Sequence, residues 1–183
     1  MDAERIKKAV RELLLSIGED PDREQFLQTP TFVSESYQEF FKGIGVDPVK
    51  FLDETFPAES TDLVMLKDIE LVSICEHHLL PFTGVAHVAY LPGEKIIGLG
   101  RIAKVVETLA ARPQLQENLG NEIADAIEAG LSPKGVLVVL EAKHQCVASR
   151  GARQPEVETV TSSARGVMQQ IEHRQEAMGL ISK

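Results

Sequence analysis

Residues 68–92 read DIELVSICEHHLLPFTGVAHVAYLP, two runs rich in branched and apolar residues on either side of a short polar centre. Runs of this composition, with partial alternation of apolar and polar residues, are typical of β-strands. We predict strands over residues 62–75 and 82–91, and the short connection between them favours an antiparallel pair. The intervening EHHLLP is then a turn, and Cys75 stands at the end of the first strand.

The chain after this pair alternates between helical and strand patterns. Four elements are predicted there: helices over residues 102–109 and 115–130, and strands over 135–146 and 157–161. The helices are indicated by apolar residues that recur at intervals of three and four, and the strands by branched apolar runs. Ser162 or Ser163 is predicted to cap a final helix that carries Val167 and Ile171. The order is ββααββ followed by a helix.

Helical periodicity dominates the N-terminal part of the chain. Three helices are predicted there, over residues 4–17, 32–41 and 48–55. Gly18 follows the first as a C-terminal cap, and Pro30 lies just before the second. The predicted fold class is therefore α+β, a single domain over residues 1–183. It consists of an N-terminal helical arm, residues 1–56, and a catalytic unit, residues 57–183.

Composition and charge exclude several classes of protein. Lys and Arg total 19 while Asp and Glu total 28, which gives a formal net charge of −9. A surface of that charge repels nucleic acid, so we expect no nucleic-acid partner, and an anionic substrate must be met by a local basic pocket. The chain begins MDAERIKK without the apolar run of a signal peptide, and no stretch reaches the roughly 18 apolar residues that cross a bilayer. We expect a cytoplasmic protein with no membrane contact.

A metal site is predicted from two separate Cys/His clusters. Cys75 and His78 form a CxxH arrangement, a spacing that lets a turn bring a thiolate and an imidazole to one ion. Along residues 135–146 the even positions form an apolar face, which we expect to continue into His144 and Cys146. The alternative is core packing, since a free Cys is often a small buried hydrophobe and a buried His is often merely hydrogen-bonded. Two such clusters favour a shared site.

Three protein ligands are typical of a catalytic zinc ion, because a structural site normally closes with a fourth. We predict that Cys75, His78 and Cys146 hold one Zn²⁺ per subunit, and ligand type alone also permits iron. The open position would hold water, whose pKa zinc lowers to about 7, so that a hydroxide nucleophile forms near neutral pH. His77 and His144 are then candidates for proton transfer.

With these residues in place, the chain resembles the GTP cyclohydrolase I family over nearly its whole length. The family-like stretches are GEDPDRE from residue 18, the segment at 68–92, QLQENL from residue 114, HQC followed by Arg150 and Gly151, and TVTSSARG from residue 159. So many segments in one order make the resemblance specific.

The resemblance implies a fold, an assembly and a reaction. The family has the tunnelling fold, an antiparallel ββααββ sheet with helices on one face, and forms pentamers that commonly stack into decamers. We therefore expect a homo-oligomer with its sites at subunit interfaces. In the implied reaction, zinc-activated water attacks C8 of guanine in GTP, the imidazole ring opens and formate leaves. The ribose carbons then rearrange to give 7,8-dihydroneopterin triphosphate.

The resemblance also implies roles for particular residues. His77 and His144 match histidines that shuttle protons in the family. Gln116 and Glu117 match the pair that recognises guanine, where a carboxylate accepts hydrogen bonds from the ring N1–H and the exocyclic amine together. Spacing alone would favour ordinary solvent-facing helix residues at these two positions.

The phosphate side departs from the family pattern. Residues 29–35 read TPTFVSE where the family has TPxRVAK, so an Arg is replaced by Phe32 and a Lys by Glu35. Residues 98–104 read GLGRIAK where the family has GLSKxxR, so a Ser is replaced by Gly100. Because Arg gives bidentate contacts to phosphate, losing such groups weakens or reshapes the binding of a triphosphate.

Several basic residues remain as candidates for phosphate binding. They are Arg101, Lys104, Arg150 and Arg153. Three functions are therefore open. The first is hydrolytic opening of the guanine ring of GTP, and the second is the same reaction by a paralogue on another guanine nucleotide or nucleoside with fewer phosphates. The third is a noncatalytic assembly module that retains zinc for stability.

Overall fold

The computed structural model describes residues 1–181 of the chain. The chain divides into two compact units, Met1–Lys42 and Gly43–Lys183. This division lies at residue 42, whereas the predicted boundary of the helical arm is at residue 56. The segment 43–56 therefore belongs to the larger unit by its contacts.

The first unit is a pair of packed helices, α1 (Ala3–Ser16) and α2 (Thr29–Phe40), as the sequence predicts. Helix α1 begins at Asp2, whose side-chain oxygen accepts a hydrogen bond of 3.0 Å from the backbone N–H of Arg5. It ends before Gly18, whose φ of 88° lies in the left-handed region that favours glycine at a helix C-terminus.

A five-stranded sheet forms the centre of the second unit, in the order β5-β2-β3-β6-β7. Its strands are β2 (Val64–Cys75), β3 (Pro81–Leu91), β5 (Pro113–Gln114), β6 (Gly135–His144) and β7 (Thr159–Gly166). Neighbouring strands are antiparallel except β5, which runs parallel to the end of β2. The predicted antiparallel sheet is confirmed, with a short fifth strand at its edge.

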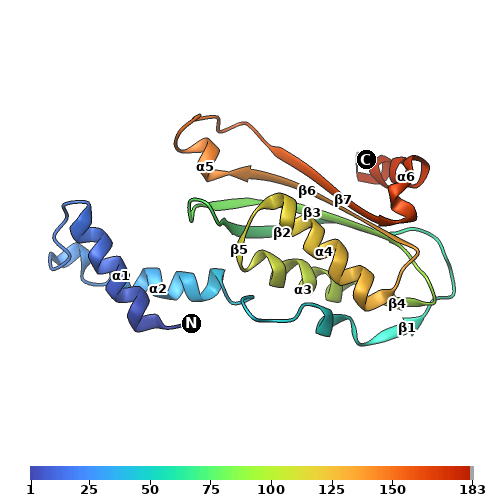
Figure 1. Ribbon diagram of the computed structural model, residues 1–183, viewed down its shortest axis with the longest axis horizontal. Helices are drawn as coiled ribbons and strands as arrows, with labels where there is room; N and C mark the ends of the chain where they lie inside the picture. The colour runs from blue at the N-terminus through green and yellow to red at the C-terminus, as the bar shows by residue number, and fades with distance from the viewer. Residues whose placement is uncertain (182–183) are drawn as a thin grey trace. The chain divides into compact units, whose positions relative to one another are not determined.

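Two helices, α3 (Leu99–Ala110) and α4 (Gln116–Leu131), cover one face of this sheet (Figure 1). The even residues of β6 point toward them, and Val136, Val138 and Leu140 are all at most 1% exposed. Burial of this face against the helices is the main source of apolar stabilisation in the second unit. The predicted ββααββ arrangement with helices on one face is confirmed.

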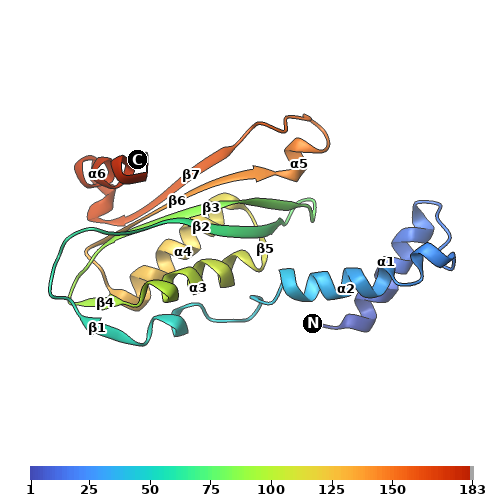
Figure 2. The ribbon, with the colours of Figure 1, turned by 180° about the vertical axis from the view of Figure 1, so that it is seen from behind.

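The opposite face of the sheet is partly covered by the C-terminal helix α6 (Ile171–Ile181) (Figure 2). Ala177 of this helix is buried in a second apolar cluster that contains Leu137 and Val139 of β6. Because both faces of β6 are covered, the strand is a continuous apolar run rather than an alternating one.

The remaining helical segments are short. Single 3₁₀ turns lie at Glu24–Phe26, Val49–Leu52 and Val167–Gln169.

None of the helices in residues 1–181 is both long enough and apolar enough to cross a bilayer. The cytoplasmic location stays a prediction.

The helix predicted over residues 48–55 is wrong. The structure has only the 3₁₀ turn Val49–Leu52 there, followed by β1 (Thr55–Pro57), which pairs antiparallel with β4 (Lys95–Ile97). Leu52 is 1% exposed and packs beneath α4, so tertiary burial of one side chain sets the path of this segment. The partner strand is about forty residues away in sequence, and local propensity therefore does not reveal it.

The fourth strand and the final helix predicted over residues 157–171 both exist, but the predicted boundary between them is wrong. Ser162 and Ser163 lie inside β7 and do not cap a helix, and α6 begins only at Ile171. Strand β7 pairs with β6 over its whole length, with Ser163 opposite Val138. The ladder satisfies backbone groups along eight residues of β7, whereas a serine cap would satisfy only one or two donors.

The strand predicted over 135–146 is too long. Strand β6 ends at His144, opposite Phe82, and Cys146 lies in a single helical turn, α5 (Gln145–Ala148). The apolar face of β6 therefore continues into His144 as predicted, but Cys146 reaches its position from a helical turn and not from that face.

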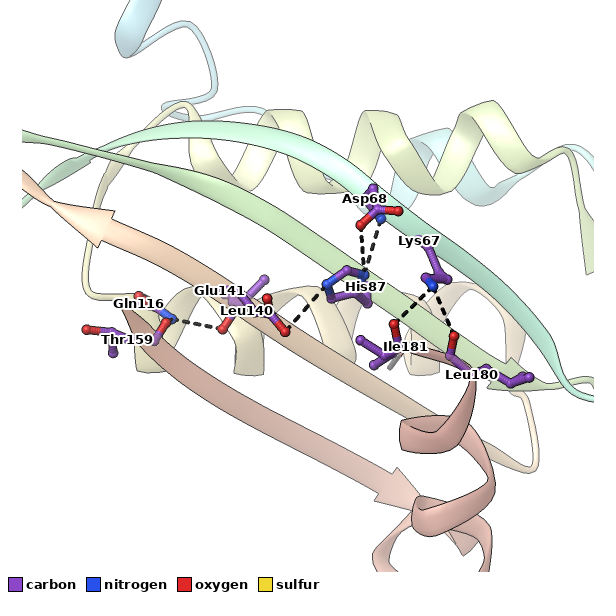
Figure 3. Close-up of polar contacts among 9 residues, drawn as sticks. All are labelled: Lys67, Asp68, His87, Gln116, Leu140, Glu141, Thr159, Leu180 and Ile181. Atoms are coloured by element: carbon purple, nitrogen blue, oxygen red, sulfur yellow. Dashed lines mark hydrogen bonds and ion pairs between the residues drawn. The ribbon is translucent and has the colours of Figure 1, made fainter. Parts of the chain in front are cut away.

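A buried histidine, His87, lies on the sheet face opposite α3 and α4 and is only 3% exposed (Figure 3). Its Nδ1 accepts a hydrogen bond of 3.2 Å from the backbone N–H of Asp68, which stands at a bulge in β2 with φ of 56°. Its Nε2 lies 3.8 Å from a carboxylate oxygen of Glu141. Lys67, beside the bulge, donates to the last carbonyls of α6, where the helix carries partial negative charge.

Gly84 allows β3 and β6 to lie close together. A Cβ at this position would lie 1.9 Å from the carbonyl oxygen of Glu141 and 2.8 Å from Cβ of Ala142. We expect Gly84→Ala to destabilise the fold by about 3 kcal/mol, because backbone in the middle of a sheet cannot give way. This corresponds to a fall of roughly 6–12 °C in the midpoint of thermal unfolding, measured by circular dichroism.

Gly100→Ala is the matched control, because no atom lies within 4 Å of a Cβ built at that position in α3. Alanine in a helix is favoured over glycine by up to about 1 kcal/mol, so this variant should unfold at the same or a higher temperature. Equal midpoints for the two variants would contradict the close approach of β3 and β6.

Candidate metal centre

The turn between β2 and β3 brings His78 back toward Cys75. Two backbone hydrogen bonds of 2.9 Å close this turn, from Cys75 N–H to Leu80 O and from Leu79 N–H to Cys75 O. Leu79 adopts a left-handed conformation with φ of 51°. The result is a distance of 4.0 Å between Cys75 Sγ and His78 Nδ1.

The third predicted ligand, Cys146, joins this pair from α5, the helical turn that follows β6. The ligand atoms of Cys75, His78 and Cys146 all lie within 4.8 Å of one another. Donor atoms around a tetrahedral zinc ion are separated by about 3.5–3.8 Å, so small side-chain adjustments bring the three onto one ion. The structure thus places together the three residues that the sequence predicts as ligands.

The chemistry of these groups fits a metal cation. Burial raises the pKa of the Cys146 thiol, proximity to Cys75 raises it further, and the charge of Arg150 opposes this. The raised pKa means that the Cys146 thiolate forms less readily without a counter-charge. A divalent cation supplies that charge, because metal binding favours the thiolate and displaces the proton.

His144 lies beside the cluster and is held on two sides. Its ring stacks on Phe82 with centroids 4.5 Å apart and an angle of 11° between the planes. Its Nε2 lies 2.7 Å from Oε1 of Gln116. Burial lowers the pKa of His144, and the negative charge of Glu117 partly offsets this. A lowered pKa favours the neutral imidazole, the form that can accept a proton.

The second predicted proton-transfer residue, His77, is placed differently. It is exposed on the turn, and its ring centroid lies 6.2 Å from that of His78. His77 is therefore accessible to solvent next to a proposed ligand, whereas His144 is half-buried.

Gln116 and Glu117 differ in exposure although they are neighbours in sequence. Gln116 is 1% exposed, while Glu117 is exposed in the first turn of α4.

Phe82, which stacks on His144, is the residue of this site that sequence reasoning missed. Its only sequence signal is its position directly after the His-containing turn, because the pairing with His144 depends on the register of β3 and β6.

The four basic candidates divide into two pairs. Arg150 and Arg153 are exposed in the segment that follows α5, at the metal end of the sheet. Arg101 and Lys104 are in the first half of α3, and Arg101 pairs with Glu54 while Lys104 pairs with Glu107.

Helix α3 separates the second pair from the metal cluster of the same chain. Its last residue, Ala110, leads into β5, and Gln114 of β5 pairs with Cys75. From Arg101 to Ala110 the helix rises by about 14 Å, at 1.5 Å per residue. From Lys104 to Ala110 the rise is about 9 Å, so both residues lie on the part of α3 that is away from Cys75, His78 and Cys146 of their own chain.

The departures from the family pattern lie on the surface. Phe32 is 60% exposed on α2, and Glu35 on the same helix is also exposed. Gly100, at the start of α3, has open space where a side chain would project.

Comparison with known proteins finds a family model and relatives that match almost the whole chain. The family model described as GTP cyclohydrolase I matches residues 6–182. GTP cyclohydrolase 1 of Leifsonia xyli is 53% identical over 182 residues, which cover 98% of this chain and 95% of that protein. GTP cyclohydrolase 1 of Carboxydothermus hydrogenoformans is 51% identical over 183 residues, covering 99% and 95%.

Among solved structures, the apo form of the archaeosine synthase QueF-Like is similar with a TM-score of 0.50. It is 21% identical and covers 59% of this chain and 97% of its own, so this likeness concerns the fold alone. The predicted tunnelling fold is confirmed. Because the family model and the relatives cover almost the entire sequence, the chain belongs to the GTP cyclohydrolase I family.

Proposed function

We propose that this protein opens the imidazole ring of guanine in GTP by hydrolysis, releases formate and forms 7,8-dihydroneopterin triphosphate. The observation that carries the proposal is the cluster of Cys75, His78 and Cys146, with ligand atoms within 4.8 Å of one another, in a chain of this family. All proposed site residues lie between residues 75 and 153, which supports residues 57–183 as the catalytic unit.

The proposed cofactor is one Zn²⁺ per subunit, held by Cys75, His78 and Cys146. Two thiolates and an imidazole are donors that zinc prefers, and three protein ligands leave a position for solvent. When bound there, zinc supplies Lewis-acid activation of a water molecule near neutral pH.

The side chains around the cluster have separate proposed tasks. His144, half-buried on Phe82, and His77, exposed on the turn, move protons to and from the substrate. Glu117 accepts hydrogen bonds from N1–H and the exocyclic amine of guanine, and its exposed position in the first turn of α4 supports this task.

The triphosphate is proposed to contact basic residues from more than one subunit. Arg150 and Arg153 follow α5, close in sequence to Cys146, but Arg101 and Lys104 lie in the half of α3 that is away from the candidate metal site of their own chain. A site that uses all four residues therefore needs a second copy of the chain. This geometry supports a homo-oligomer, and the resemblance suggests a pentamer or decamer.

A second candidate is the same ring opening on a guanine compound with fewer phosphates. The observation that favours it is the replacement of two basic residues by Phe32 and Glu35, both exposed on α2. Fewer positive charges reduce the affinity for a triphosphate more than for a monophosphate or nucleoside.

The test is a substrate panel with the purified, zinc-loaded protein. GTP, GDP, GMP and guanosine are supplied separately, and formate release and the fluorescence of the oxidised pterin are measured. The proposal predicts formate from GTP with the highest kcat/KM. A preference for GMP or guanosine supports the second candidate, and no formate from any of the four supports the noncatalytic alternative.

Glu117→Gln is expected to weaken recognition of guanine. A neutral amide cannot accept both guanine N–H groups, and hydrogen bonds to a charged group contribute about 1.5–3 kcal/mol. We therefore expect kcat/KM for GTP to fall about 10- to 100-fold, mainly through KM. The preference for GTP over ITP, which lacks the exocyclic amine, should also narrow.

Glu128→Gln serves as the control for this variant, because Glu128 is an exposed acid near the other end of the same helix. Its kinetics should match those of the unmodified protein. An unchanged KM in Glu117→Gln would remove Glu117 from the substrate site.

A further inference from the structure

Both ends of the Gln116 amide are bonded inside the protein. Its Nε2 donates to the carbonyl oxygen of Leu140 at 3.1 Å, to that of Thr159 at 2.9 Å and to Oγ1 of Thr161 at 3.2 Å (Figure 3). Its Oε1 lies 2.7 Å from Nε2 of His144. At 1% exposure, the side chain has no free polar atom to offer a ligand.

The surrounding acceptors determine which way the amide points. The carbonyl oxygens of Leu140 and Thr159 can only accept hydrogen bonds, so the NH₂ group of Gln116 must face them. If the amide were flipped, its oxygen would face the two carbonyl oxygens, and these buried acceptors would repel one another. Oε1 therefore faces His144.

This orientation determines where His144 carries its hydrogen. Oε1 of Gln116 is an acceptor, so a hydrogen bond of 2.7 Å requires a hydrogen on Nε2 of His144. A neutral imidazole has a single N–H, and the lone pair that can receive a proton is then on Nδ1. Stacking on Phe82 fixes the plane of the imidazole ring, and the hydrogen bond to Gln116 fixes which ring nitrogen faces the amide.

We propose that Gln116 is a positioning residue that holds His144 as its Nε2–H tautomer, and that it is not a contact to the substrate. This one amide joins the start of helix α4 to the two strands β6 and β7. Under this proposal, Glu117 recognises guanine and Gln116 does not contact it. The kinetic consequence rests on the proposed function, whereas the position of the hydrogen does not.

The kinetic test compares Gln116→Met, His144→Ala and the double variant in the zinc-loaded enzyme. We expect Gln116→Met to lower kcat for GTP about 10- to 100-fold, the usual effect of removing a group that orients a functional histidine, with KM changed less than about threefold. In the His144→Ala background the same substitution should have no further effect, because residues that act as one unit are not additive.

Gln114→Met is the matched control. Gln114 is also buried, at 3% exposure, and its Nε2 donates to Leu109 O and to Glu122, each at 3.1 Å, without contacting His144. It should retain kcat within about twofold at a similar loss of thermal stability. A raised KM with unchanged kcat in Gln116→Met, or effects of Gln116→Met and His144→Ala that multiply, would overturn the proposal.

A second measurement uses the unmodified protein and does not depend on any variant folding or on turnover. Neutron diffraction from deuterium-exchanged crystals of the zinc-loaded protein locates exchangeable hydrogens directly. We expect deuterium on Nε2 of His144, within hydrogen-bonding distance of Gln116, and an amide with its nitrogen toward Leu140 and Thr159. A deuterium only on Nδ1, or the reverse amide orientation, refutes the assigned tautomer of His144 even if opening of the guanine ring of GTP is confirmed.

Discussion

Replacing His78 with alanine is expected to remove the metal and the activity together. The variant loses one of three ligands, so bound zinc should fall from about one per subunit to a small fraction of that. Without a metal, the pKa of water rises from about 7 back toward its much higher value in bulk solvent, and formate release should fall roughly a thousandfold or more. Elemental analysis and a formate assay on the same preparation measure both effects.

His173→Ala controls for the loss of a histidine elsewhere, because His173 lies in α6, away from the cluster. It should keep both its metal and its turnover. Elemental analysis of the unmodified protein also distinguishes zinc from iron, which the ligand set permits. Full metal content and activity in His78→Ala would show that the ligand set is different from the one proposed.

His144→Ala is expected to separate chemistry from metal binding. Removing a group that transfers protons costs about 10²- to 10⁴-fold in rate, so kcat for GTP should fall within this range. KM should change by less than about threefold and the zinc content should stay near one per subunit, because the three ligands remain. Steady-state kinetics with elemental analysis provide both values.

Lys143→Ala is the neighbouring control. Lys143 is exposed and forms a surface ion pair of 3.4 Å with Glu156, an interaction that contributes little to stability. This variant should behave like the unmodified protein. If His144→Ala lost its zinc instead of its turnover, His144 would be a metal-site residue and its proposed role in proton transfer would fail.

Several elements followed from local pattern alone. The helices α1, α3 and α4 are visible as apolar residues at intervals of three and four, and the long strands β2, β3 and β6 as branched runs. Long periodic segments are reliable because many residues indicate the same structure at once. The errors concern short elements, where one or two residues carry the signal.

The misread end of the chain illustrates the limit of local signals. Serine is suitable both as a helix cap and on the face of a strand, so Ser162 and Ser163 do not distinguish the two structures. The outcome depends on pairing with β6, some twenty-five residues earlier, where the ladder satisfies far more backbone groups. The pairing of β1 with β4 was invisible for the same reason.

The amino-acid sequence by itself determined the α+β class and which residues are candidate metal ligands, because ligand types and long hydrophobic patterns are properties of the residues themselves. It did not determine that Gln116 is buried while its neighbour Glu117 is exposed. Adjacent helix positions point about 100° apart, and which one is buried depends on how α4 packs against β6 and β7. Nor did it show that α3 carries Arg101 away from the candidate metal site of its own chain, since that distance arises only when the helix lies along the sheet.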